Sequence, residues 1–221
     1  MEFTLRYYKT QPLVIIIIVL ASAIDLIIAN LMIPLLECLN NENSLGENFY
    51  VIRAPTNTAL IVSILALYDN YLWKYGIFKL LVNVPNLNGR YKGVLNSSFT
   101  DKPIYTYAEI KQTASKIKIQ FYFKDGNNQE TSSKSLIENI ELADDGFYRL
   151  YLFYLNTGTT GNGNLDCHEG ANVLKYIPEN NKGSNKKPAE LIGHYFTNRK
   201  PCQTRGNLKY EFEDKQRKGY Y

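Results

Sequence analysis

The chain has 221 residues, enough for one ordinary domain and an attached segment, because a domain commonly takes ~100–200 residues. Its 18 tyrosines and 10 phenylalanines beside a single tryptophan favour β-sheet, and this composition excludes a disordered chain and a coiled coil. From Asn83 onward 20 Lys and Arg residues accompany 15 Asp and Glu residues, which is too mild an excess for a protein that binds a DNA or RNA polymer.

Residue types that usually perform chemistry are sparse and scattered. The three cysteines are an odd set that does not form a disulfide framework, and the two histidines, His168 and His194, have no metal-ligand spacing around them. No phosphate-binding loop, dinucleotide-binding glycine motif or nucleophile elbow is present. We therefore expect neither an enzyme nor a protein with a metal or a cofactor.

Residues 13–36 form the most apolar stretch of the chain, interrupted only by Ser22, Asp25 and Asn30. A helix of this length, at ~1.5 Å per residue, exceeds the ~30 Å hydrocarbon core of a bilayer. A cleavable signal peptide has a shorter apolar region, whereas here the apolar run resumes after Asp25. The stretch predicts a transmembrane helix.

A second, weaker span is predicted at residues 56–75. Its charged and amide side chains gather at one end, where Asp69, Asn70 and Lys74 would lie at the headgroups within a belt of four aromatic residues: Tyr68, Tyr71, Trp73 and Tyr75. The alternative is an amphipathic helix on the membrane surface.

Charged residues flanking the spans predict the topology. Lysine and arginine are richer before the first span and after the second than in the acidic loop around 38–55. By the positive-inside rule, the N-terminus and the long C-terminal part lie in the cytoplasm, and the loop faces out.

Small and polar residues form one stripe on each predicted helix. Asp25 is flanked by Ala21 and Ala29, and the second stripe contains Ala59, Ser63, Ala66 and Asn70. A carboxylate at the bilayer centre costs ~2.5–3.5 kcal/mol, so Asp25 should face another helix rather than lipid. That helix belongs either to the same chain or to another subunit. The candidate residues for membrane function are Asp25, Asn30, Asp69 and Asn70.

Beyond Val84 the pattern changes to short β-rich runs bounded by turn clusters such as 125–128 and 143–146. Eight strands are expected, at 87–95, 106–113, 116–123, 132–141, 147–155, 171–177, 189–197 and 206–213. Successive antiparallel hairpins of this number predict a small up-and-down β-barrel, with an open sandwich as the alternative. The chain then divides into a two-helix transmembrane hairpin at 1–82 and a cytoplasmic β-barrel domain at 83–221.

Alternation places polar and aromatic side chains together on strand faces. Gly193, Tyr195, Thr197 and Arg199 share one predicted face. Two further rows are Leu150, Leu152, Tyr154, Asn156 and Thr131, Ser133, Ser135. A cyclic dinucleotide requires rings on which its bases can stack, hydroxyls and a guanidinium that bind its phosphates, and amides that bond to the edges of its bases. The alternative is that the tyrosines are barrel core and Arg199 is a loop charge.

Several motifs, in this order behind two predicted spans, carry a family resemblance: Leu87-Asn-Gly-Arg-Tyr-Lys-Gly, Gln112, Thr131-Ser-Ser-Lys-Ser, Leu150-Tyr-Leu-Phe-Tyr-Leu-Asn, His168-Glu-Gly, Leu191-Ile-Gly-His-Tyr-Phe-Thr-Asn-Arg and Thr204-Arg-Gly. The chain resembles the two-transmembrane, β-strand-rich effectors of bacterial cyclic-oligonucleotide anti-phage signalling (CBASS).

The resemblance implies a minimal eight-stranded barrel that binds a cyclic dinucleotide made by a nucleotidyltransferase of the same system. It further implies that the protein oligomerises and disrupts the bacterial inner membrane, leading to abortive infection. The candidate ligand-binding residues are Tyr195, Thr197, Arg199, Tyr154, Asn156, Ser133 and Thr204. A membrane-tethered lipocalin-like carrier or sensor of an apolar ligand is the alternative function.

Overall fold

The computed structural model describes residues 5–32, 34–35, 45–124, 130–158, 166–180, 187–200 and 202–220, with the backbone alone at 32 and 45–56. The chain divides into two compact units. The first contains Met1–Asn83 and Thr113–Ser115, and the second contains Val84–Gln112 and Lys116–Tyr221.

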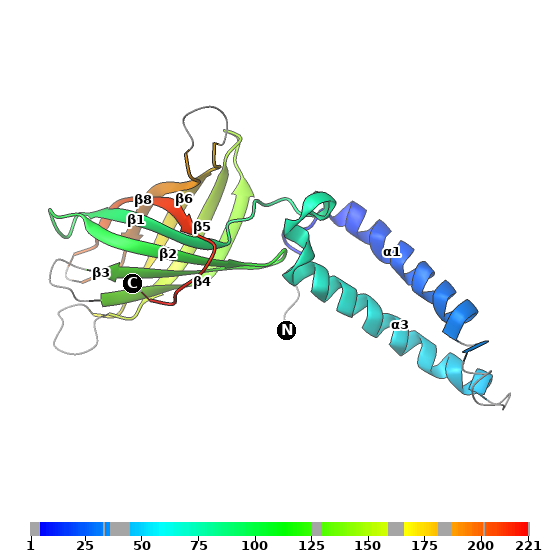
Figure 1. The fold of residues 1–221 in the computed structure, drawn as a ribbon. Helices are drawn as coiled ribbons and strands as arrows, with labels where there is room; N and C mark the ends of the chain where they lie inside the picture. Colours follow the sequence, from blue (N-terminus) through cyan, green and yellow to red (C-terminus); the bar gives the residue numbers. More distant parts are fainter. Residues whose placement is uncertain are drawn as a thin grey trace. The chain divides into compact units, whose positions relative to one another are not determined.

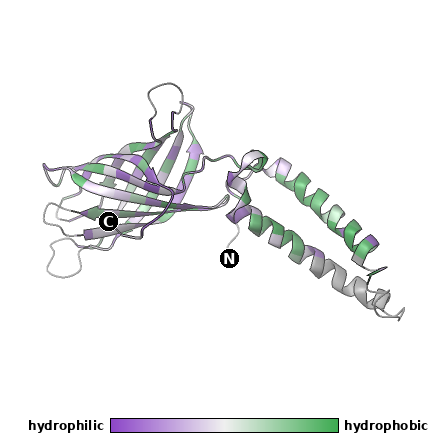
Figure 2. Ribbon diagram, in the orientation of Figure 1, coloured by the Kyte–Doolittle hydropathy of each residue, from purple (hydrophilic) through white to green (hydrophobic). Residues whose placement is uncertain are grey.

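The first unit is built on two helices, α1 (Thr10–Ile27), which continues as a π-helix at Ile28–Met32, and α3 (Leu45–Asn70) (Figure 1). Among the described residues, Thr10–Leu31 is the one helical stretch long and apolar enough to cross a membrane. Apolar residues colour most of α1 in Figure 2, and six of its aliphatic side chains are more than half exposed: Val14, Ile15, Ile18, Val19, Leu26 and Ile27.

The second helix differs from the predicted span at both ends. It begins at Leu45 and runs through Pro55, so 45–55 is helical rather than part of a loop, while 38–44 lie outside the described residues. It ends at Asn70, and 3-10 helices follow at Leu72–Lys74 and Gly76–Leu81. The expected aromatic belt is divided, because Tyr71 and Tyr75 are exposed whereas Tyr68 and Trp73 are buried. A second membrane span therefore stays a prediction.

The carboxylate of Asp25 has a partner within the same chain. The amide Nδ2 of Asn57 on α3 donates to Asp25 Oδ1 at 3.2 Å. Of the two arrangements that the sequence left open, this contact supports packing between the helices of one hairpin. It leaves untested whether Asp25 also contacts other subunits.

The other polar residues predicted to serve membrane function also bond within the chain. Asn30 Nδ2 donates to the carbonyl of Leu26, and Asn70 Nδ2 donates to the carbonyl of Ala66, each one turn earlier. Asp69 is buried and accepts a 2.9 Å bond from the Tyr8 hydroxyl. The bonds of Asn30 and Asn70 are local, whereas that of Asp69 joins segments 61 residues apart. A role in the membrane stays a prediction for all three.

The second unit is a closed barrel in which each strand pairs antiparallel with its neighbours in the chain, and β8 pairs with β1 (Figure 1). Closure excludes the open sandwich. The strands are β1 (Gly89–Ser97), β2 (Ile104–Gln112), β3 (Ile117–Lys124), β4 (Glu130–Leu142), β5 (Tyr148–Asn156), β6 (His168–Ile177), β7 (Glu190–Thr197) and β8 (Arg205–Asp214).

All eight expected strands are present within a few residues of their predicted bounds. The expected turn at 143–146 is confirmed as well: Gly146 has a φ of 76° and donates its amide to the Ala143 carbonyl at 2.9 Å. Glycine suits this left-handed conformation because it has no Cβ. The other expected turn, at 125–128, lies outside the described residues.

The barrel interior is apolar towards one end and polar towards the other. We call the end where β1 begins, at Gly89, the apolar end, and the end where it finishes, at Ser97, the polar end. Towards the apolar end the interior is filled by almost fully buried aliphatic side chains: Ile110, Ile117, Ile119, Ile140, Leu150, Leu174 and Leu191. An eight-stranded barrel is just wide enough for side chains to fill or for one small ligand to enter. A ligand site is therefore expected towards the polar end.

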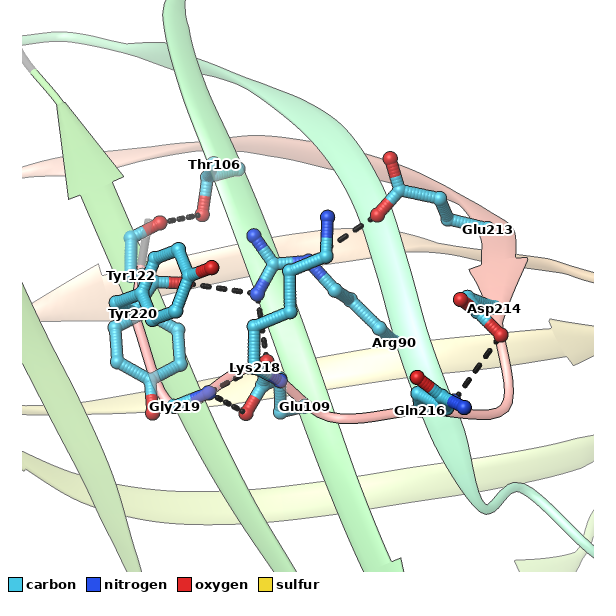
Figure 3. Close-up of polar contacts among 10 residues, drawn as sticks. All are labelled: Arg90, Thr106, Glu109, Tyr122, Glu213, Asp214, Gln216, Lys218, Gly219 and Tyr220. Carbon is cyan, nitrogen blue, oxygen red and sulfur yellow. Dashed lines mark hydrogen bonds and ion pairs between the residues drawn. The ribbon is translucent and has the colours of Figure 1, made fainter.

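After β8 the chain folds back along the outer wall of the barrel. The amides of Lys218 and Gly219 donate to the Glu109 carboxylate, and the carbonyl of Tyr220 accepts from Arg90 Nη1 (Figure 3). We call residues 215–220 the C-terminal strap. It covers an ion pair on β1 and β2 that would otherwise face solvent.

Candidate ligand-binding site at the polar end of the barrel

The structure brings the predicted ligand-binding residues to the polar end of the barrel. Six of the seven are less than 9% exposed: Ser133, Tyr154, Asn156, Tyr195, Thr197 and Thr204. Burial alternates along each strand, so these side chains share the interior with Leu152 on β5 and Leu191 on β7. The three polar rows expected from alternation thus converge, and their role as a binding site stays a prediction.

Four of these polar side chains satisfy one another in pairs. Asn156 Nδ2 donates to Ser133 Oγ at 2.8 Å, and Asn156 Oδ1 accepts the amide of Gly158, also at 2.8 Å. The hydroxyls of Thr197 and Thr204 lie 2.7 Å apart across the β7–β8 connection. Such bonds fix the orientation of groups that would cost free energy if they were buried without partners.

Tyr195 is held at both ends of its side chain. Its hydroxyl donates to Ser97 Oγ at 2.7 Å, and its ring covers Gly206, the residue opposite it on β8. A Cβ at Gly206 would lie 2.7 Å from Tyr195 Cε1, so the ring needs glycine at that position. Burial raises the pKa of Tyr195 above its ordinary value, although the bonds to Ser97 and Thr204 act in the opposite direction. The hydroxyl is therefore neutral at physiological pH.

Tyr154 repeats the same arrangement on the neighbouring strands. It lies opposite Gly170 on β6, where a Cβ would overlap the phenol of Tyr154. The Phe121 ring packs against it edge-on with a centroid distance of 6.4 Å. Burial raises the pKa of Tyr154 well above its ordinary value. Two neutral phenol rings are thus fixed in the barrel wall towards the polar end.

Arg199 does not lie where alternation predicted. β7 ends at Thr197, so Arg199 belongs to the following loop rather than to the interior face of the strand. Its guanidinium stacks on Phe99 of the β1–β2 loop, with Cζ 3.6 Å from the ring centroid. Partial burial lowers the pKa of Arg199, although electrostatic interactions with Tyr195 and Asp166 act in the opposite direction. This cation at the polar end can still receive an anionic group.

Asn172 is an interior residue that the sequence analysis missed. It lies on β6 between Leu152 of β5 and Tyr195 of β7, and it is 5% exposed. Its Oδ1 atom is buried, and no described residue donates a hydrogen bond to it. An unsatisfied buried carbonyl costs ~1–3 kcal/mol, so the barrel tolerates a polar group that its own fold does not use.

A usable signal for Asn172 existed in the sequence. The expected strand at 171–177 begins three residues later than β6, and the row Gly170, Asn172 and Leu174 was therefore not considered as one face. Ser97 and Phe99 were missed because their contacts, with Tyr195 and Arg199, join segments about 100 residues apart. No local pattern encodes such pairs.

The polar end contains groups that can bind an organic phosphate. It combines two phenol rings, several hydroxyls, two amides and a guanidinium. Across the described ranges no group of three or more His, Cys, Asp or Glu side chains could hold a metal ion. The described cysteines, Cys167 and Cys202, are exposed and free.

Comparison with protein families identifies the barrel. The family described as Cap15, cyclic dinucleotide receptor domain, matches residues 82–211. Comparisons with curated proteins and with solved structures give no match. The matched region contains all eight strands apart from the last residues of β8, and it covers more than half of the chain. The family is one of receptors that sense a cyclic nucleotide in CBASS effectors, and it is not a known enzyme family. The protein belongs to the Cap15 cyclic dinucleotide receptor family.

Proposed function

We propose that this protein is a membrane effector of anti-phage defence that binds a cyclic dinucleotide at the polar end of its barrel. Binding then drives oligomerisation, and the N-terminal helices of the assembly disrupt the inner membrane. The observation that carries the proposal is the cluster of buried phenol, hydroxyl and amide groups towards one end of a barrel that matches a cyclic dinucleotide receptor family.

Each part of a cyclic dinucleotide has a suitable group at the polar end. The rings of Tyr154 and Tyr195 provide surfaces on which bases stack, a contact that contributes ~1–3 kcal/mol per base. The guanidinium of Arg199 can form charge-assisted hydrogen bonds to a phosphodiester. We therefore assign Tyr195, Thr197, Arg199, Tyr154, Asn156, Ser133 and Thr204 to the ligand site.

A lipocalin-like carrier of an apolar ligand fits the interior less well. Such a carrier needs an aliphatic lining around its ligand, but most of the buried aliphatic side chains here pack tightly towards the apolar end. Towards the polar end, leucines such as Leu95 and Leu208 share the interior with buried hydroxyls and amides. An apolar ligand would leave the buried Oδ1 atom of Asn172 without a partner, at a cost in free energy.

The exposed aliphatic side chains of α1 support a place in the bilayer. Side chains such as Ile15 and Leu26, which are 61% and 66% exposed, would be costly in water and favourable in lipid. In the proposed topology both helices cross the inner membrane, and the N-terminus and the barrel are cytoplasmic. Clustering of many hairpins would then strain the bilayer.

A dye-release assay tests this function. The full chain is reconstituted into vesicles of phosphatidylethanolamine and phosphatidylglycerol that contain a fluorescent dye, and cyclic dinucleotides are added outside. We expect release with at least one cyclic dinucleotide and none with its linear form, and we expect the Arg199→Ala variant to need a tenfold or higher nucleotide concentration for the same release. Release that does not depend on the nucleotide, or tight binding without release, would overturn the proposed membrane step. Co-purified lipid inside the barrel would instead favour the carrier.

A further inference from the structure

Asn172 Oδ1 differs from the other polar groups at the polar end, because those groups form hydrogen bonds with one another. The Tyr195 hydroxyl donates to Ser97, and Asn156 bonds to Ser133 and Gly158. Among the described side chains of the barrel interior, Asn172 alone has a buried acceptor atom that receives no hydrogen bond. The fold therefore holds a hydrogen-bonding position that a ligand can complete.

Asn172 lies where it can contact a base of the ligand rather than a phosphate. It lies directly beside Tyr195 in the register of β6 and β7, with Leu174 as the next interior residue towards the apolar end. Arg199, the cation suited to a phosphate, lies in the loop beyond the end of β7. A base stacked on the ring of Tyr195 would present its edge to the neighbouring strand, where the amide lies.

We propose that Asn172 reads the edge of an adenine base in the bound cyclic dinucleotide, an inference that rests on the proposed function. An amide carries an acceptor and a donor side by side, and adenine presents the complementary amino donor beside a ring nitrogen acceptor. Guanine presents two acceptors at the corresponding edge in place of that pair. The empty acceptor, Oδ1, receives the exocyclic amino group.

A ligand-side substitution tests the inference without any mutation. Binding of cyclic di-AMP and cyclic di-IMP to the full chain in detergent is measured by calorimetry, because inosine replaces the amino group of adenosine by a carbonyl. We expect the wild-type protein to bind cyclic di-AMP about tenfold to hundredfold more tightly, the range that one good base contact contributes. Equal affinities for the two ligands would overturn the inference.

The protein-side test uses two amide-to-leucine variants. Asn172→Leu should reduce the preference for cyclic di-AMP over cyclic di-IMP to less than about threefold, and it should raise or preserve the melting temperature because it removes an unsatisfied polar group. The matched control is Gln112→Leu, since Gln112 accepts from the Leu87 amide and donates to the Pro85 carbonyl. This control should lower the melting temperature and leave the preference unchanged.

The outcomes separate this inference from the proposed function. If the wild-type protein binds none of cyclic di-AMP, cyclic GMP-AMP and cyclic di-GMP, the proposed function fails and the inference fails with it. If the wild-type protein binds cyclic di-GMP alone, or if Asn172→Leu keeps the full preference for cyclic di-AMP, the role of Asn172 is wrong while the receptor function stands.

Discussion

Arg90 and Glu109 form an ion pair on the outer wall of the barrel, with Nη1 and Oε1 2.6 Å apart and both side chains at most 5% exposed. They are direct cross-strand neighbours on β1 and β2. Arg90 also bonds to Glu213 at 3.1 Å (Figure 3). Its guanidinium lies over the ring of Tyr107, with Cζ 3.8 Å from the ring centroid. The C-terminal strap supplies further partners, since main-chain groups of Lys218, Gly219 and Tyr220 bond to the pair.

Glu109→Gln should destabilise the barrel by about 3 kcal/mol, because it leaves a buried arginine with less compensating charge. The matched control is Glu211→Gln, whose carboxylate pairs with Lys209 in solvent and should contribute less than about 1 kcal/mol. Chemical denaturation followed by fluorescence measures both. Equally small losses of folding stability in the two variants would show that the buried pair stabilises the barrel no more than a surface pair does.

Arg199→Ala should weaken cyclic dinucleotide binding about tenfold to hundredfold while leaving the barrel folded, because a charge-assisted bond to a phosphate contributes ~1.5–3 kcal/mol. Arg205→Ala is the matched control, since Arg205 is an exposed arginine at the same end of the barrel. Calorimetry measures both affinities. The proposed phosphate contact is wrong if the two variants bind alike.

Tyr195→Phe removes the hydroxyl bond to Ser97 but keeps the ring, so we expect a loss of about 1 kcal/mol in stability and less than about threefold in affinity. Tyr195→Leu keeps an apolar side chain but removes the stacking surface, and it should lose tenfold or more in affinity. Thermal melts and calorimetry separate the two effects. Similar affinities for both variants would exclude stacking on Tyr195.

Asp25→Leu should insert into the membrane at least as well as the wild type and bind nucleotide normally, because leucine is favoured in hydrocarbon over a carboxylate. If Asp25 contacts other subunits in the active assembly, this variant loses dye release. Asn57→Leu removes the partner of Asp25 in the same hairpin and keeps the carboxylate. We expect Asn57→Leu to retain release. Full release by Asp25→Leu would show that the residue serves hairpin packing alone.

Strand positions were predictable because burial alternates along each strand, as at Leu150, Leu152 and Tyr154. Closure of the barrel was expected from the number of strands. By contrast, the helical start at Leu45 was missed because residues 45–55, which include Glu47 and Arg53, were assigned to the acidic loop between the two predicted spans. Arg199 was misplaced because alternation continues in the sequence beyond the point where the ladder of β7 ends.

Contacts that join distant segments could not be predicted. The strap bonds to Glu109 through main-chain groups of Lys218 and Gly219, and a main-chain amide leaves no trace in residue type. The empty acceptor on Asn172 likewise depends on which neighbours already satisfy each other. Three-dimensional geometry, rather than composition or spacing, decides both.

The most direct test of the receptor assignment is a thermal melt of the full chain in detergent with cyclic di-AMP, cyclic GMP-AMP, cyclic di-GMP and their linear counterparts. A ligand at one hundred times its Kd adds about 2.7 kcal/mol to folding stability. We predict that at least one cyclic dinucleotide raises the melting temperature by several degrees, that its linear form does not, and that Arg199→Ala reduces the shift to about half or less at the same ligand concentration. Melting temperatures unchanged by every cyclic dinucleotide would contradict the proposed ligand site.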